Sequence, residues 1–222
     1  MASKAAVQRT QTGVVEAQFA RVANSGSGRH PQLAALLASS GPSSARDLAD
    51  AVHLLCHLYG RHPGLIDVAL QAGTAGDAKN WLIGASEAFE RERLYLVRLT
   101  AAVGPQPSTA GSAQTEAALV AQRHALETLA GSERKGCALG AATALVEDWR
   151  SLRRLLDRAA HRAGIDVPAC TLPDEESVAQ AIHAGTDTQG SERALAFGSE
   201  QLLLQHRALF DLLEARAEAR QD

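Results

Sequence analysis

Aromatic residues are scarce in this sequence, which has two Trp, two Tyr and four Phe among 222 residues. Its apolar positions are filled mainly by Ala and Leu. These residues lead the helix-propensity scale, whereas strands are rich in aromatic and β-branched residues. No stretch alternates apolar and polar residues as a half-buried strand does. The composition therefore predicts an all-α fold.

Long apolar runs, a basic excess and paired cysteines are also missing. No run approaches the roughly 20 apolar residues that span a bilayer, and residues 1–23 lack the dense hydrophobic segment of a secretory signal. The formal net charge of -3 gives no reason to expect a nucleic-acid partner. Cys56, Cys137 and Cys170 are far apart and form no C-x-x-C motif, as is typical of reduced thiols. We expect a cytoplasmic protein with no membrane or nucleic-acid partner.

The motifs of several common enzyme classes are absent. The sequence has no G-x-x-x-x-G-K-[ST] phosphate loop, no dinucleotide fingerprint after a strand, no G-x-S-x-G nucleophile elbow, and no H-E-x-x-H or paired-cysteine zinc motif. These absences argue against the usual nucleotide hydrolases, dehydrogenases, serine hydrolases and zinc proteases.

The stretch 132–164 predicts one long central helix. Ser132 is suited to cap its first turn, and Gly164 is suited to end it. At steps of three and four residues one face carries Cys137, Ala141, Ala144, Asp148, Leu152, Leu155 and Ala159. The first half of the helix consists almost entirely of small side chains. This favours close packing of another helix against this face. The alternative is a ligand that fills the space left by the small side chains.

The same periodicity predicts further helices over 1–23, 31–38, 45–59, 65–72, 77–103, 113–130, 174–184 and from 191 to the C-terminus, where the last residues, 216–222, should fray. We predict a single-domain helical bundle over residues 41–222, with about four long and several short helices. Residues 1–40 are expected to form an N-terminal helical arm that can detach, because the stretch 24–28 has the composition of a flexible joint.

Four of the long helices each carry one ionisable residue on the predicted apolar face: Glu92, His124, Asp148 and His206. An ionised side chain is costly to bury unless it is paired or bound, so their convergence would suit a divalent transition metal. The doubled Glu-x-x-His of di-iron bundles is missing. The simpler interpretation, which we favour, is that these groups form hydrogen bonds and ion pairs between helices, for example His124 with Asp148.

A rival metal site consists of Asp50, His53 and His57, which share a helix face at i, i+3 and i+7. Carboxylate and imidazole ligands at this spacing suit a divalent transition metal. The alternative for the two histidines is a solvent-facing or helix-pairing role.

Four tracts of the sequence are similar to those of a known family: Arg61-His-Pro-Gly64, Arg123-His-Ala-Leu126, Gly136-Cys-Ala-Leu-Gly-Ala-Ala142 and Asp148-Trp149. Over about residues 45–164 they resemble a bacterial family of uncharacterised all-helical proteins, a domain of unknown function. This resemblance implies a helical fold, and it assigns no activity and no site residues.

Two functional hypotheses follow. The first is a non-enzymatic bundle that binds a partner or a small ligand, favoured by the missing catalytic motifs and the small-residue helix. The alternative is a metal-binding or metal-dependent, oxidoreductase-like bundle that uses the carboxylates and histidines named above. Both the amphipathic arm and the small-residue face offer surfaces for a homodimer.

Overall fold

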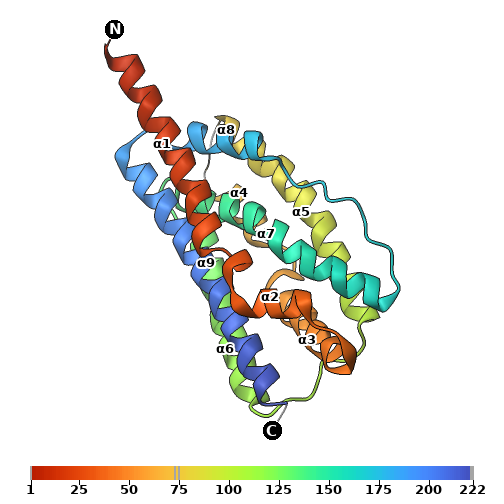
Figure 1. Cartoon of the computed structure of the whole chain (residues 1–222). Coiled ribbons are helices and arrows are strands. Elements are labelled where there is room, and N and C mark those ends of the chain that lie inside the picture. Colours follow the sequence, from red (N-terminus) through yellow and green to blue (C-terminus); the bar gives the residue numbers. More distant parts are fainter. Residues whose placement is uncertain (1, 73, 75, 221–222) are drawn as a thin grey trace.

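The computed structural model describes residues 2–72, 74 and 76–220, with side chains from Gly13 onward. In this part of the chain there are nine α-helices, one 3-10 turn and no strand (Figure 1). The elements are α1 (Ala2–Ser25), η1 (Ser27–Arg29), α2 (Pro31–Ala38), α3 (Gly41–Tyr59), α4 (Leu65–Gln71), α5 (Gly76–Ala102), α6 (Ser112–Ala130), α7 (Cys137–Ala163), α8 (Glu175–Gly185) and α9 (Gln189–Glu218). The predicted all-α fold is confirmed.

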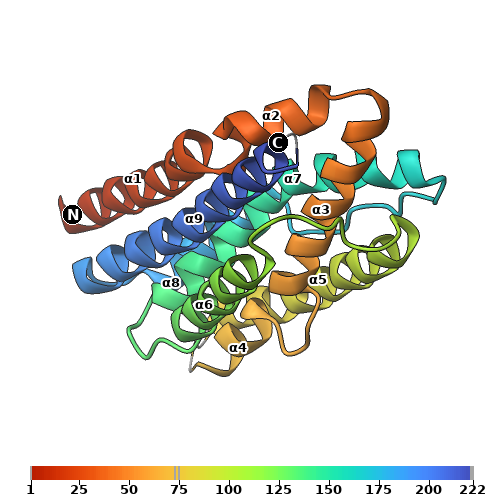
Figure 2. The same ribbon diagram turned by 90° about the horizontal axis from the view of Figure 1, so that it is seen from below.

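Helix α7 is the centre of the molecule (Figures 1 and 2). It ends at Gly164 as predicted, but it begins at Cys137, five residues later than expected. Gly136 supplies the N-cap in the left-handed region at φ 95°, while the Ser132 hydroxyl accepts a bond from the Arg134 amide in the preceding turn. All seven positions of the predicted apolar face are buried, so the predicted rotation of this helix is correct.

Helices α7 and α9 run in the same direction, side by side through the body (Figure 2). Their contacts keep the same order along both helices, from Gly140 beside Leu195 to Asp148 beside His206. The extended stretch 165–174 and α8 carry the chain back from the end of α7 to the start of α9 (Figure 1). This long return is what allows two consecutive long helices to be parallel.

Glycines bring α7 and α9 unusually close together. A Cβ atom at Gly140 would overlap the Leu195 carbonyl, and one at Gly198 would overlap the Cys137 carbonyl. The predicted close packing of the small-residue helix is therefore confirmed, and at Gly140 and Gly198 the backbone of the facing helix occupies the space that a ligand would need. The small-residue face is buried inside the chain. It is therefore not exposed as one of the two surfaces that we considered for a homodimer.

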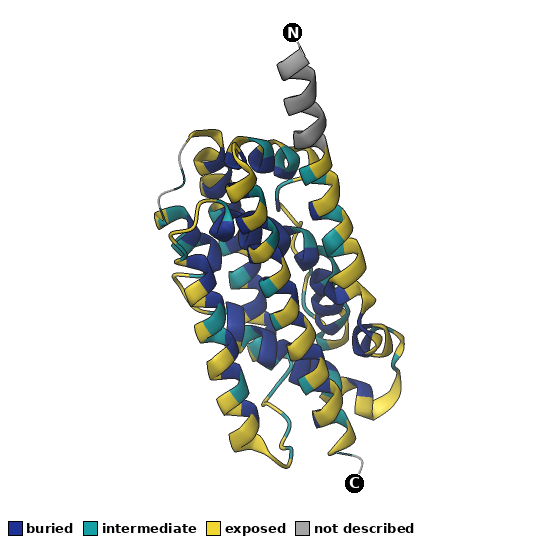
Figure 3. Ribbon diagram, turned by 90° about the vertical axis from the view of Figure 1, so that its left-hand side faces the viewer, coloured by how far each residue is buried: buried dark blue, intermediate teal, exposed yellow. Residues whose placement is uncertain are grey.

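The N-terminal segment packs on the bundle. Four apolar side chains of α1 lie half-buried against the core: Val14, Val15, Phe19 and Val22. Gln18 donates to the Thr143 hydroxyl at 3.1 Å, and Leu33 of α2 belongs to the same core as α7. Within the stretch 24–28, which we predicted as a flexible joint, Gly26 and Ser27 are buried. Figure 3 shows that the buried positions face the middle of the bundle.

Several predicted helix boundaries shift by a few residues. Helix α3 begins at Gly41, four residues before the predicted start. Gly73, which we expected to end the following helix, lies outside the described residues, as do residues 221–222. Within the described part, none of the helices has the length and apolarity needed to cross a membrane.

The α7–α9 contact predicts opposite effects for two Gly→Ala substitutions. Gly140→Ala places a methyl group against backbone that cannot rotate away, so it should lower the free energy of unfolding by about 1–3 kcal/mol. Gly84→Ala is the control, because Gly84 is exposed in α5 with open space around its Cβ position, and it should add about 0.5–1 kcal/mol through helix propensity. Urea denaturation measures both; equal effects would contradict the close contact.

Candidate functional site

The four predicted site residues do not form one group. Asp148 and His206 meet in the core, with 2.6 Å between a carboxylate oxygen and Nδ1. Glu92 is also buried but belongs to a separate set of contacts. His124 is exposed on α6, so the prediction that all four converge is wrong, as is the suggested pairing of His124 with Asp148.

The error at His124 comes from the rotation assigned to α6. We placed Val120 and His124 on the inner face, whereas the structure exposes both. The helix instead buries Leu119, Leu126 and Leu129. Three leucines remove more apolar surface from water than the Ala and Val residues of the assumed face, and that comparison was available in the sequence.

Asp148 is the acceptor that joins four elements of the fold. Its two carboxylate oxygens accept from the Ser27 amide at 2.7 Å, the Ser27 hydroxyl at 2.5 Å and Nδ1 of His206 at 2.6 Å. Nε2 of His206 is hydrogen-bonded to the Tyr59 hydroxyl. We call Ser27, Tyr59, Asp148 and His206 the Asp148 cluster. It connects η1, α3, α7 and α9.

The protonation of the cluster follows from its contacts. Burial, and next the negative charge of Asp148, raise the pKa of Tyr59 well above its usual value, so Tyr59 keeps its proton and donates it to Nε2 of His206. Nδ1 of His206 faces the Asp148 carboxylate, which is an acceptor, and donates to it. Every polar group of the cluster is thereby satisfied.

Asp148, His206 and Tyr59 present a carboxylate, an imidazole and a hydroxyl in the same order as a catalytic triad. Here, however, the three groups are buried away from solvent. Ser27, Tyr59, Asp148 and His206 are at most 4% exposed. Their donors and acceptors are used by one another, and Gly26 presses its backbone against the Asp148 carboxylate. The cluster therefore stabilises the fold by holding η1 and three helices together.

Glu92 is neutralised by a buried arginine. Its carboxylate accepts from Arg153 at 2.7 Å and from the Trp149 indole at 3.0 Å. Arg153 also donates to Asp157 at 2.6 Å, and Asp157 accepts from the Tyr95 hydroxyl at 3.0 Å. We had assigned Arg153 to the polar side of its helix; the lone Glu92 on an apolar face was the signal that a buried cation had to face it.

The three residues of the rival metal site, Asp50, His53 and His57, also make separate contacts. Asp50 is buried between Arg216, at 2.7 and 2.8 Å, and Arg220, at 2.6 Å. His53 bonds the carbonyl of Gly104 at 2.8 Å, and His57 is exposed on the same helix. Arg216 is buried in α9, so the prediction that the helix frays from residue 216 is also wrong.

The surroundings of His57 disfavour the protonated, charged form of its imidazole. Partial burial, and next the positive charge of Arg123, lower the pKa of His57 from its usual value. Across residues 2–72, 74 and 76–220, no group of three or more His, Cys, Asp or Glu side chains is placed to hold a metal ion. The carboxylates that we considered as ligands are instead bound by Arg, His, Ser and Trp donors.

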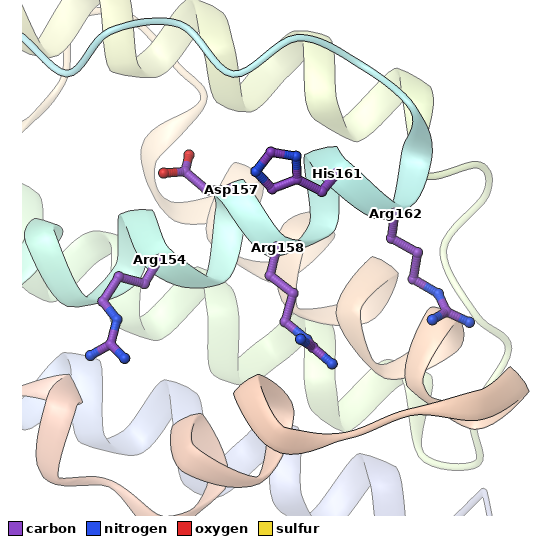
Figure 4. A pocket seen from close by; sticks show the side chains of 5 residues that line it. All are labelled: Arg154, Asp157, Arg158, His161 and Arg162. Atoms are coloured by element: carbon purple, nitrogen blue, oxygen red, sulfur yellow. The ribbon is translucent and has the colours of Figure 1, made fainter.

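The most distinctive surface feature is a basic groove along the second half of α7. Its volume is about 600 Å³, and Arg154, Asp157, Arg158, His161 and Arg162 line it. Figure 4 shows the three arginines pointing to one side of α7, toward α2 and α3, with Asp157 and His161 on the other side. We call this set of five residues the α7 groove.

Two of the three guanidinium groups of the α7 groove are held by backbone carbonyls, which leave their positive charge uncompensated. Arg158 donates to the carbonyl of Ser39, and Arg162 donates to the carbonyl of Gly41 at 2.7 Å. Among the described carboxylates, none lies within ion-pairing distance of Arg154, Arg158 or Arg162. We did not single out these three arginines from the sequence, although their i, i+4, i+8 spacing is visible there.

The Asp148 cluster predicts a large loss of stability when its acceptor is changed. Asp148→Asn keeps the shape but places an amide NH₂ against the donors of Ser27 or His206. This should lower the free energy of unfolding by about 3–5 kcal/mol, the usual result of breaking a buried charged pair. Asp166→Asn is the control, because Asp166 is exposed in the loop after α7. If both variants unfold at the same urea concentration, the cluster does not stabilise the fold.

Comparison with known proteins gives one match. No curated protein and no solved structure matches the chain. A family described as "Family of unknown function (DUF6975)" matches residues 22–221. This confirms the resemblance stated from the sequence and extends it from residues 45–164 to most of the chain. The chain belongs to this family of unknown function, DUF6975.

Proposed function

We propose that this protein is a non-enzymatic binding protein that holds a negatively charged ligand in the α7 groove. One observation carries the proposal: Arg154, Arg158 and Arg162 line the same groove and have no carboxylate partner among the described residues. Uncompensated positive charges in a concave surface raise the local concentration of anions.

The acid in the groove does not cancel these charges. Asp157 accepts from Arg153 at 2.6 Å and from Tyr95 at 3.0 Å, and Arg153 is shared with Glu92. Asp157 is one carboxylate in a groove lined by three arginines, so it offsets only part of their charge. The groove therefore presents an excess of positive charge at its surface.

Stabilisation of the helix C-terminus accounts for only part of the pattern. Cations in the last turn interact favourably with the helix dipole, and His161 and Arg162 occupy that turn. Arg154 lies roughly two and a half turns before the end of α7, beyond the reach of this effect. A ligand explains why the row of arginines continues back along the helix.

The contacts of the interior weaken the metal-dependent alternative. Asp148 accepts three hydrogen bonds, Glu92 faces Arg153, and Asp50 faces Arg216 and Arg220. A metal would have to displace these donors. We therefore base the proposal on the surface of α7.

Thermal unfolding at constant ionic strength tests the proposal. Tripolyphosphate and citrate are compared with chloride, because a bound ligand stabilises the folded state. At least one of the two polyvalent anions should raise the melting temperature of the wild-type protein, and Arg154→Gln with Arg162→Gln should remove most of the increase.

The control is Arg193→Gln with Arg207→Gln. Both arginines are exposed on α9, so this variant loses the same charge from another surface and should keep the increase. Equal increases in the two double variants would show that the anions act without the α7 groove, and no increase in the wild type would reject the function.

A further inference from the structure

The three arginines of the α7 groove form a row with regular spacing. Arg154, Arg158 and Arg162 follow one another at four-residue steps, and each step rises about 6 Å along a helix. Their guanidinium groups point to the same side of α7 (Figure 4). A ligand that contacts all three must carry negative charge at several points along its length.

Only a few N–H donors of Arg154, Arg158 and Arg162 form hydrogen bonds within the described part of the chain. A guanidinium group has five N–H donors, and the bonds to Ser39 and Gly41 each use one donor, from Arg158 and Arg162. Nε of Arg158 is buried and has no acceptor in the described part of the chain. Arg154 and Arg162 are exposed, so their remaining N–H donors can be reached by a ligand.

The charge and the lining of the groove define the ligand class. Three fixed positive charges call for a polyanion, and a groove of about 600 Å³ is in the range for a small molecule. Arginine is the preferred partner of phosphate, because its fork of donors matches phosphate oxygens. The five lining residues include no Phe, Tyr or Trp that would stack on a nucleobase, and the His161 ring lies on the other side of α7 from the three arginines (Figure 4).

From this geometry we infer that the ligand of the α7 groove is a small compound that carries a chain of phosphates, recognised through the phosphates alone. The inference rests on the proposed function. A chain of tetrahedral phosphates offers a negative charge and oxygen acceptors at every unit, so it can meet donors that emerge at successive levels of the helix. A carboxylate presents its two oxygens in one plane and one charge per group.

Isothermal titration calorimetry at constant ionic strength tests this inference. The probes are orthophosphate, pyrophosphate, tripolyphosphate, citrate and magnesium-free ATP. Affinity should rise with each added phosphate, and tripolyphosphate should bind at least about tenfold more tightly than orthophosphate or citrate, the effect expected of one additional charge-assisted hydrogen bond. ATP should match tripolyphosphate.

Arg154→Gln should weaken tripolyphosphate binding about tenfold, and Arg193→Gln should leave it unchanged. Circular dichroism melting curves check that both variants are folded. Arg154 is exposed and makes no ion pair with a described residue, so the substitution should preserve the fold.

The outcomes separate the inference from the proposed function. If citrate binds as tightly as tripolyphosphate and Arg154→Gln weakens both, the groove is an anion site but the phosphate-chain assignment is wrong. Tighter binding of ATP than of tripolyphosphate would contradict recognition through phosphates alone. If none of the probes binds, both proposals fail.

Discussion

The close approach of α7 and α9 is the constraint on which the rest of the structure depends. It requires that Gly140 and Gly198 carry no side chain at the crossing, and it runs two long helices in parallel through the centre. One consequence is that Asp148 faces His206 at 2.6 Å. A second is that the turn η1 can place Ser27 on the same carboxylate, which brings the N-terminal segment into the core.

The buried charges of the bundle follow one rule: each carboxylate has its own donors. Asp148 is held by Ser27 and His206, Glu92 by Arg153 and Trp149, and Asp50 by Arg216 and Arg220. Removing an ion from water is costly unless such contacts compensate it. The Asp148 set joins η1, α7 and α9, the Glu92 set joins α5 and α7, and the Asp50 set joins α3 and α9. These sets explain packing specificity better than they explain chemistry.

The sequence contained enough to predict the helices and much of the core. The apolar face of α7 was readable because its Ala and Leu residues recur at helical spacing, and Gly164 marks the end of that helix. The Asp148–His206 contact was within the predicted site because both residues interrupt apolar faces. The rotation of α6 was wrong, because its small residues give a weak periodicity and the larger apolar surface of Leu119 and Leu126 was not weighed against them.

Other features depend on contacts between residues that are distant in the sequence. The stretch 24–28 is polar and glycine-rich, and only the Asp148 carboxylate, 121 residues away from Ser27, makes it an ordered, buried turn. The α7 groove requires the position of the Ser39 and Gly41 carbonyls relative to α7.

The contacts inside the bundle indicate that its ionisable groups stabilise the fold, and we propose that those along the outer side of α7 act on a ligand. Chemical modification of arginines with phenylglyoxal, followed by mass spectrometry in the presence and absence of tripolyphosphate, tests this division most directly. Our account predicts that tripolyphosphate slows modification of Arg154 and Arg162 and leaves Arg193 and Arg207 unchanged. Unaltered reactivity of Arg154 and Arg162, with protection at arginines elsewhere, would contradict it.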